Sequence, residues 1–251
     1  MQRRSFLKFF TFLLTSLSFK VSSNNNNEKI SFNHGVASGD PTNTNVIIWT
    51  RITKVSNTNI KVNWEISDDI NFRKIIHSGT SKTSAHKDFT VKVDAKISKE
   101  YKGTPIFYRF ICNNYFSPIG STITLPVDNP DLFNLAFCSC SNYPAGFFNA
   151  YKERAKNKGV DLVLHLGDYI YEYDKNGYAS ENSNELDRVS IPSNELISLE
   201  DYRLRHAQYK TDKNLQLLHK NKPMIVVWDD HEFTNNTWKN GAENHSKDEG
   251  I

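Results

Sequence analysis

Hydrophobic and polar residues alternate in short runs along the first half of the chain. The clearest runs lie at 60–66 and 89–93, and further strand-like runs lie at 46–49, 75–77, 106–112 and 121–125. A period of two with one polar face is typical of antiparallel strands. Residues 28–127 are therefore predicted to form an antiparallel β-sandwich of the fibronectin III or immunoglobulin type. The sequence of this region suggests no titratable cluster, so its expected role is support or the shaping of a substrate edge.

The pattern changes after Pro126 and the Asp-Asn-Pro sequence at 128–130, which mark a boundary. Dense apolar runs follow at 132–140, 160–166 and 223–228, with predicted helical segments at 145–157 and from 198 to about 220. Runs of this density are typical of parallel strands that helices cover on both faces. Residues 174–197 are polar and are predicted to be a surface loop. The alternation of strand and helix predicts a parallel sheet with right-handed crossovers, and a two-domain α+β chain overall.

The first 27 residues resemble a leader segment followed by a polar spacer. Arg3 and Arg4 precede Phe6, Leu7 and Lys8, in an order that is similar to a twin-arginine export signal. An ordinary secretory signal is the alternative, and either one predicts an exported protein, periplasmic or secreted. The twin-arginine export machinery is the expected partner. The apolar run at 9–17 is too short to span a bilayer, so no stable membrane anchor is expected.

Charge and composition exclude two classes of protein. The content of 38% hydrophobic and 12% aromatic residues is that of a globular chain and excludes a disordered one. The formal charge is +3, but four of the cations lie in the leader, and without them residues 21–251 carry −1. Because no basic field remains, nucleic acid is excluded as a binding partner.

Each of the three predicted parallel strands ends in side chains that can carry chemistry. The first ends at Cys140, the second runs into Gly167–Tyr171, and the third runs into Asp229–Glu232. Parallel strands bring these ends to one edge of a sheet, where open α/β sheets bind their ligands. Several anionic groups at one place are costly unless cations neutralise them. The sequence therefore predicts a metal centre at this edge.

The kinds of ligand narrow the choice of metal. A Tyr171 phenolate and a Cys140 thiolate favour ferric iron, since both suit a strongly charged, thiophilic ion. The carboxylates of Asp168 and Asp230 suit a harder second ion such as calcium, and Asp168 could bridge the two. Such a centre can activate water and stabilise the charge of a phosphoryl group. His231, beside a ligand, could donate to a phosphate oxygen or protonate the leaving group.

Less specific interpretations stand beside these. Cys140 and Tyr171 could be a plain thiol and a packing residue. Other candidates favour structural roles: His165 as a core or outer-shell residue, His206 as a packing residue, and Asn235 and Asn236 as turn residues with an alternative role as amide ligands. The residues His34, Ser38 and Asp40 are too close in sequence to predict a hydrolase triad.

The motifs at the strand ends also carry a resemblance to a known family. The order Cys140, then Gly167–Tyr171, then Trp228–Glu232 is similar to the alkaline phosphatase D (PhoD-like) family of metallophosphatases. The segments 32–41, 46–51 and 202–209 are similar to other parts of that family. The resemblance covers nearly everything from 28 to 251. It implies an exported hydrolase of phosphate monoesters and diesters that uses iron (Fe³⁺) and calcium (Ca²⁺).

The resemblance also implies roles for individual residues. Cys140, Asp168 and Tyr171 would be ligands on the iron side, Asp230 a ligand of the second metal, and His231 a contact to the phosphate. Members of the family continue well beyond the Asp-Asp-His-Glu sequence, whereas this sequence ends at Ile251, twenty residues after His231. Residues 131–251 are thus expected to be a partial, truncated catalytic domain of the metallophosphoesterase type. The chain is expected to be a metal-dependent hydrolase of phosphate esters. The alternative is a shortened, inactive remnant or one half of a split phosphatase, and a pure interaction sandwich is the third hypothesis.

Overall fold

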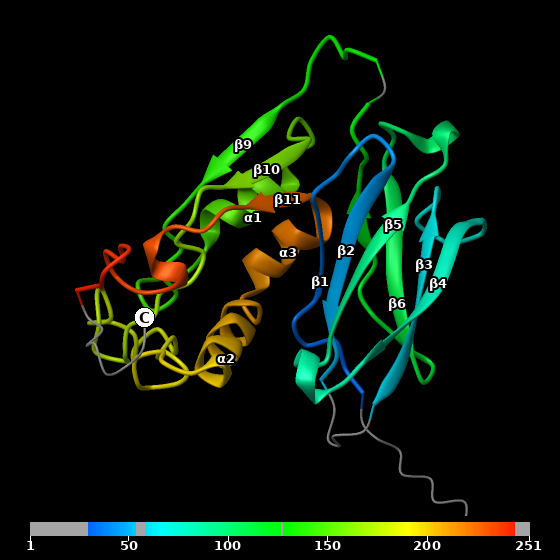
Figure 1. Cartoon of the computed structure of the whole chain (residues 1–251). Helices are drawn as coiled ribbons and strands as arrows, with labels where there is room; N and C mark the ends of the chain where they lie inside the picture. The colour runs from blue at the N-terminus through cyan, green and yellow to red at the C-terminus, as the bar shows by residue number, and fades with distance from the viewer. Residues whose placement is uncertain (1–29, 54–58, 127, 244–251) are drawn as a thin grey trace, which may run out of the picture.

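The computed structural model describes residues 30–53, 59–126 and 128–243. The predicted export signal and spacer at 1–27 lie outside the described residues. Within those residues, no helix combines the length and the apolar character that crossing a membrane requires. The described chain forms two lobes that lie side by side (Figure 1).

The first lobe consists of two antiparallel sheets. One has the order β1-β2-β5, and the other has the order β4-β3-β6-β7 with β8 paired to β6. The strands are β1 (Val36–Gly39), β2 (Asn45–Arg51), β3 (Ile60–Ser67), β4 (Ile75–Thr83), β5 (Thr90–Lys96), β6 (Ile106–Cys112), β7 (Tyr115–Phe116) and β8 (Gly120–Thr122). Two 3-10 turns, η1 (Ala85–Lys87) and η2 (Lys99–Tyr101), complete this lobe.

The hydrophobic residues that alternate with polar ones in the predicted strands form the core of this lobe. Val46 and Ile48 of β2 and every second residue of β3, from Ile60 to Ile66, pack into one hydrophobic cluster shared by both sheets. Burying these side chains contributes roughly 1.5–3 kcal/mol each relative to exposure. The prediction of an antiparallel sandwich is confirmed at this level. The finer likeness to fibronectin III or immunoglobulin domains stays a prediction.

The second lobe contains a three-stranded parallel sheet of order β11-β10-β9. Its elements are β9 (Leu135–Cys138), α1 (Asn149–Lys156), β10 (Leu162–His165), α2 (Leu199–Tyr209), α3 (Lys213–Asn221), β11 (Met224–Val226) and the 3-10 turn η3 (Asp230–Glu232). The predicted strands, and the helix expected at 145–157, are present but shorter at their ends. Helix α2 begins with a capping box: the side chain of Ser198 accepts from the Asp201 amide, and the side chain of Asp201 accepts from the Ser198 amide.

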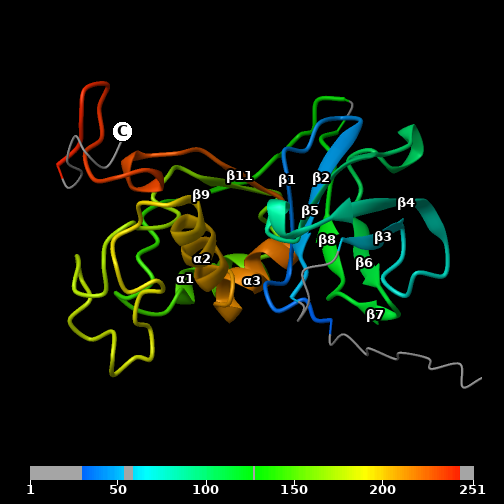
Figure 2. The same cartoon turned by 60° about the horizontal axis from the view of Figure 1, so that its bottom comes forward.

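Both α1 and α3 lie on one side of the parallel sheet, as Figures 1 and 2 show. Ala136, Val163 and Met224 point to that side and join a core with residues of the helices. Leu135 and Phe137 point the other way, and Phe137 is 61% exposed. Among the described residues helices cover only one face, contrary to the expectation of helices on both.

The two lobes meet where β1 approaches β11. A methyl group built on Gly39 would lie 2.4 Å from the carbonyl oxygen of Met224, so only glycine allows this approach. Gln216 of α3 adds a hydrogen bond of 2.7 Å to the carbonyl oxygen of Asn33. The sandwich thus packs directly against the lobe that carries the strand ends.

The outer face of the β1-β2-β5 sheet carries titratable groups that the sequence did not suggest. Arg51 of β2 binds Asp88 through Nε and Nη2, at 2.8 and 2.7 Å, and its Nη1 lies 3.2 Å from Nε2 of His34. The expectation of a lobe without a titratable cluster is therefore wrong. The distance in sequence hid the cluster, because β-pairing brings 34, 51 and 88 together.

Candidate metal centre

The three strand ends converge as predicted. The amide of Cys140 donates to the carbonyl oxygen of Gly167 at 3.2 Å, and the amide of Ser141 donates to that of Asp168 at 2.8 Å. These two bonds continue the pairing of β9 with β10 beyond the last regular residue of each strand. Because β11 pairs with the other side of β10, η3 follows at the same edge.

The backbone at this edge is held in uncommon conformations. Cys140 and Asp168 have φ of 59° and 55°, in the left-handed region that non-glycine residues rarely adopt. Gly167 has φ of 100°, and a methyl group there would lie 2.4 Å from Cβ of Asp229. Glycine at 167 therefore allows the second strand end to touch the third, which brings Asp168 toward η3.

The change Gly167→Ala is expected to destabilise the second lobe by about 2 kcal/mol or more, since it adds left-handed strain to a steric clash. Urea denaturation of the two proteins measures the difference. Gly159→Ala is the matched control: the methyl group would meet only the side-chain oxygen of Asn157, at 3.3 Å. Equal midpoints for both variants would show that the contact with Asp229 does not constrain the edge.

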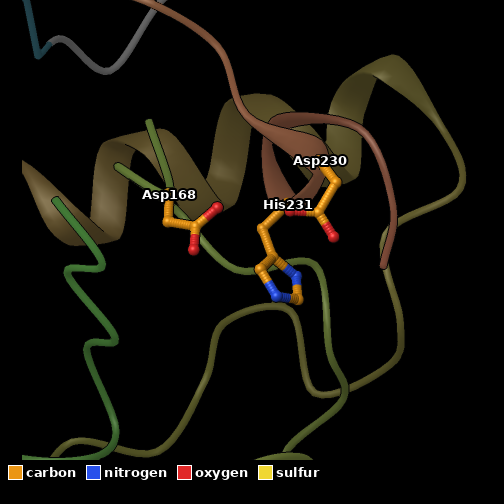
Figure 3. A group of neighbouring side chains, drawn as sticks. All are labelled: Asp168, Asp230 and His231. Carbon is orange, nitrogen blue, oxygen red and sulfur yellow. The ribbon is translucent and has the colours of Figure 1, made fainter. Parts of the chain in front are cut away.

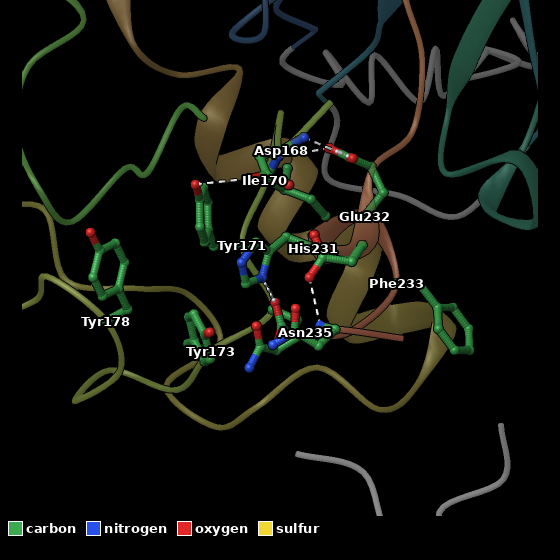
Figure 4. Close-up of polar contacts among 12 residues, drawn as sticks. Asp168, Ile170, Tyr171, Tyr173, Tyr178, His231, Glu232, Phe233 and Asn235 are labelled. Atoms are coloured by element: carbon green, nitrogen blue, oxygen red, sulfur yellow. Dashed lines mark hydrogen bonds and ion pairs between the residues drawn. The ribbon is translucent and has the colours of Figure 1, made fainter. Parts of the chain in front are cut away.

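Glu232 holds the turn that carries Asp168 in place, a role that the sequence did not reveal. Its carboxylate accepts the amide of Asp168 at 2.9 Å, that of Asp229 at 2.6 Å and that of Tyr169. Figure 4 shows this carboxylate directed at the turn. The side chain is 7% exposed, so these amides neutralise a charge that is removed from water. Glu232 therefore ties the second strand end to the third.

Asp168, Asp230 and His231 form the cluster best suited to a cation. One ligand atom from each lies within 4.8 Å of the others, and Figure 3 shows the three side chains converging. Among the described residues, Oδ1 of Asp168 is buried and has no hydrogen-bond partner. A buried carboxylate oxygen without a partner is costly unless a cation or an unseen water satisfies it. The donor set and this oxygen together fit a metal ion.

Tyr171 lies in contact with the same carboxylate, and Cys140 lies next to it. The phenol of Tyr171 donates to Oδ2 of Asp168 at 3.1 Å. Burial raises the pKa of this phenol, and the neighbouring Asp168 and Cys140 raise it further. The phenol therefore keeps its proton unless a cation lies beside it. Cys140 is exposed and, with Tyr171, lines a cleft of about 500 Å³.

Glu172 orients His231, and the sequence did not single it out. The fully buried Glu172 accepts from Nδ1 of His231 at 2.7 Å, and its other oxygen accepts the amide of Asn235 at 2.8 Å. Burial alone lowers the pKa of His231, but the bond to Glu172 and the nearby carboxylates Asp168 and Asp230 outweigh it. The net pKa is raised above 6.5.

The change Glu172→Gln is expected to lower the pKa of His231 below its value in the unchanged protein. Burial lowers this pKa, and the variant lacks the carboxylate charge that raises it. With the folded pKa raised, the stabilisation by this pair is fully present below pH 6.5 and is lost as the pH rises through the folded value. NMR titration of the His231 ring in chelator-treated protein measures the pKa. His77, an exposed histidine of β4, is the internal control. An unchanged His231 titration would exclude the assigned role of Glu172.

The other candidates have the structural surroundings that were expected of them. His165 is buried, with Nε2 at 2.9 Å from the Ser141 hydroxyl. His206 stacks on Tyr169 but is exposed, so it packs less completely than expected. The ring of His34 lies within hydrogen-bond distance of Arg51 and Thr53, and no hydrogen bond to Ser38 occurs among the described residues. Asn236 donates its amide to Oδ2 of Asp230 at 2.5 Å. Its backbone, not its side chain, thus contacts the cluster.

Known protein families match the two lobes separately. The family model described as "PhoD-like phosphatase, N-terminal domain" matches residues 18–126, and the one described as "PhoD-like phosphatase" matches residues 135–251. The chain is 40% identical over 228 residues to "Alkaline phosphatase D" of Bacillus subtilis (strain 168), an alignment that covers 87% of this chain and 38% of that protein.

A solved structure supports the same relationship. The "Structure of PhoD" matches with a TM-score of 0.79 and 39% sequence identity, over 87% of this chain and 42% of that chain. The chain therefore spans less than half the length of these relatives. Because the matches extend over both lobes and all three strand ends, the chain belongs to the PhoD-like phosphatase family.

Proposed function

We propose that the second lobe carries the front part of a phosphate-ester hydrolase site, for monoesters and diesters. One observation carries the proposal: the buried Oδ1 of Asp168 lacks a hydrogen-bond partner among the described residues, and Asp168 clusters with Asp230 and His231 at the edge of a parallel sheet. Membership of a phosphatase family gives this anionic cluster its chemical context. The name of the relative, an alkaline phosphatase, supports the same reaction.

The proposed ligands divide into two groups. Cys140, Asp168 and Tyr171 would hold a ferric ion, and Asp230 would hold calcium, with Asp168 able to serve both. His231 lies in the same cluster and is proposed to act on the proton, not as a ligand. Bound metal would supply an activated water and a counter-charge for the phosphoryl group. The identity of both metals rests on the donor types and on the family resemblance.

His231 would handle the proton in the reaction. Its Nδ1 is engaged with Glu172, so Nε2 is the nitrogen that can face a substrate. A raised pKa keeps the ring protonated at higher pH than an ordinary histidine. The protonated Nε2 would donate to a phosphate oxygen or to the leaving group. Glu172 would fix the ring in the orientation that this transfer needs.

A complementary polypeptide layer is also part of the proposal. Phe137 and Val227, from β9 and from just after β11, lie exposed on the sheet face opposite α1 and α3. Parallel sheets are ordinarily covered on both faces, and the relatives extend well beyond the matched part. A separate carboxyl-terminal half, comparable to the rest of those relatives, is the proposed partner. Export through the twin-arginine machinery to the periplasm or the medium completes the proposal.

The proposal is tested with purified protein, iron and calcium. Hydrolysis of aryl phosphate monoesters and diesters is measured with the chain alone and with the carboxyl-terminal half of the Bacillus subtilis relative added. Turnover in either preparation, with a visible charge-transfer band that Tyr171→Phe removes, is the expected result. If both preparations lacked turnover and bound metal, the hydrolase proposal would be rejected and the inactive remnant favoured.

A further inference from the structure

A second, larger cavity lies between the two lobes, apart from the metal cluster. Its volume is about 960 Å³. The outer face of the β1-β2-β5 sheet supplies Trp49, Arg51 and Lys92, and the α2 segment supplies further wall residues, among them Arg203 and Lys210. None of the five residues proposed for the metal site lines it. The cavity is therefore distinct from the metal cluster, and Glu232, which lines the cavity and accepts the amide of Asp168, connects the two.

The walls of this cavity hold more positive than negative charge. Lys82, Lys87, Lys92, Arg203 and Lys210 line it, and among the described residues none of them has a carboxylate within ion-pair distance. The acidic residues in the wall are already engaged. Asp88 is paired with Arg51, and Glu232 accepts backbone amides. An excess of cations around a cavity concentrates anions there.

Lys210 is the most unusual of these cations. Its Nζ donates to the Tyr169 hydroxyl at 2.8 Å, lies 3.0 Å from Nε2 of His219, and sits 5.1 Å from the ring centre of Trp49. The ammonium group of Lys210 thus lies at the junction of the two lobes, next to the side chains of Tyr169, His219 and Trp49. Burial lowers the pKa of Lys210 to about 7. An anion bound beside Nζ would favour its charged form.

Aromatic side chains complete the wall. Trp49, Tyr202, Trp228 and Phe233 line the cavity, and Trp228 is 78% exposed. Exposed tryptophan beside cations is suited to a ligand with a flat apolar part and a negative charge. The volume matches that of small-molecule sites, which is about 300–1,000 Å³. We propose that this cavity binds an organic phosphate with an aromatic group, held by Lys210, Lys92 and Arg203 and stacked on Trp49 or Trp228.

Phenylphosphonate is the probe, since its carbon–phosphorus bond resists phosphatase hydrolysis. Calorimetry is expected to show one site per chain for the Asp168→Asn variant, because Asp168 does not line the cavity. The unchanged protein should show the same site beside any binding at the metal cluster. Lys210→Met is expected to weaken binding about tenfold, the loss of one charge-assisted hydrogen bond. Lys92→Met, at an exposed strand position, should weaken it less, and Lys152→Met, on the exposed face of α1, should leave it unchanged.

Three controls decide the outcome. Benzyl alcohol, which has the ring without the charge, is expected to bind far more weakly than phenylphosphonate. Circular dichroism checks the fold of Lys210→Met, and Lys210→Arg should restore part of the affinity. Equal affinity of the unchanged protein, Lys210→Met and Lys92→Met would overturn the proposal, as would loss of all binding in Asp168→Asn. The latter result would place the probe at the metal cluster instead.

Discussion

Asp168→Asn is expected to abolish metal binding and phosphate-ester hydrolysis together. The substitution keeps the size of the side chain and an oxygen that can accept from Tyr171, but it removes the charge that a cation needs. Changes one shell outside a metal cost about 10–100-fold in affinity or activity. Because Asp168 is a proposed ligand, the loss of kcat/KM should exceed about 100-fold. Elemental analysis and kinetic assays of the active preparation measure the two losses.

The other end of the same strand offers a matched control. Asp161 lies just before β10 and accepts the amide of Asn134 at 2.8 Å. Asp161→Asn is therefore expected to leave metal content and kcat/KM unchanged while it perturbs the strand to a similar degree. If Asp168→Asn retained full metal content, Asp168 would not be a ligand. If it retained metal but lost turnover, its carboxylate would act on the substrate instead.

The alternation of hydrophobic residues predicted the parts of the fold that depend on burial alone. β3 and β6 have an inward side chain at every second position, and these side chains form the core of the sandwich. The parallel sheet followed from three dense apolar runs. β1 was missed because Val36–Gly39 contains small and polar residues and only one strongly hydrophobic side chain. Its pairing with β2, not its own composition, makes it a strand.

The sequence predicted the site residues that lie at the ends of strands. It did not predict the residues whose hydrogen-bond partners are distant in sequence. Convergence of Cys140, Asp168 and Asp230 follows from the direction of parallel strands alone. Glu172 and Glu232 have charged side chains that are ordinarily found at the surface. Their burial depends on His231 and on the amide of Asp168, each about 60 residues away in sequence. Such pairings appear only once the fold is known.

Glu232→Ala is expected to have the largest effect on the stability of the second lobe, a loss of about 3 kcal/mol or more. The buried carboxylate accepts the amides of Asp168, Tyr169 and Asp229, and alanine would leave these donors without an acceptor. Each unsatisfied buried donor costs about 1–3 kcal/mol, and water that enters the space left by the side chain offsets part of this cost. Urea denaturation followed by near-ultraviolet circular dichroism measures the change, since the core of this lobe is rich in tyrosine.

An exposed glutamate provides the comparison. Glu153 of α1 pairs with Lys156 at 3.2 Å, and its side chain is 72% exposed. Glu153→Ala should therefore change stability by less than about 0.5 kcal/mol. Glu232→Gln keeps one accepting oxygen and should lie between the two. Because Glu232 joins the second strand end to the third, its loss should also weaken metal binding by moving Asp168 away from Asp230. Coincident unfolding curves for Glu232→Ala and Glu153→Ala would show that these bonds do not hold the edge together.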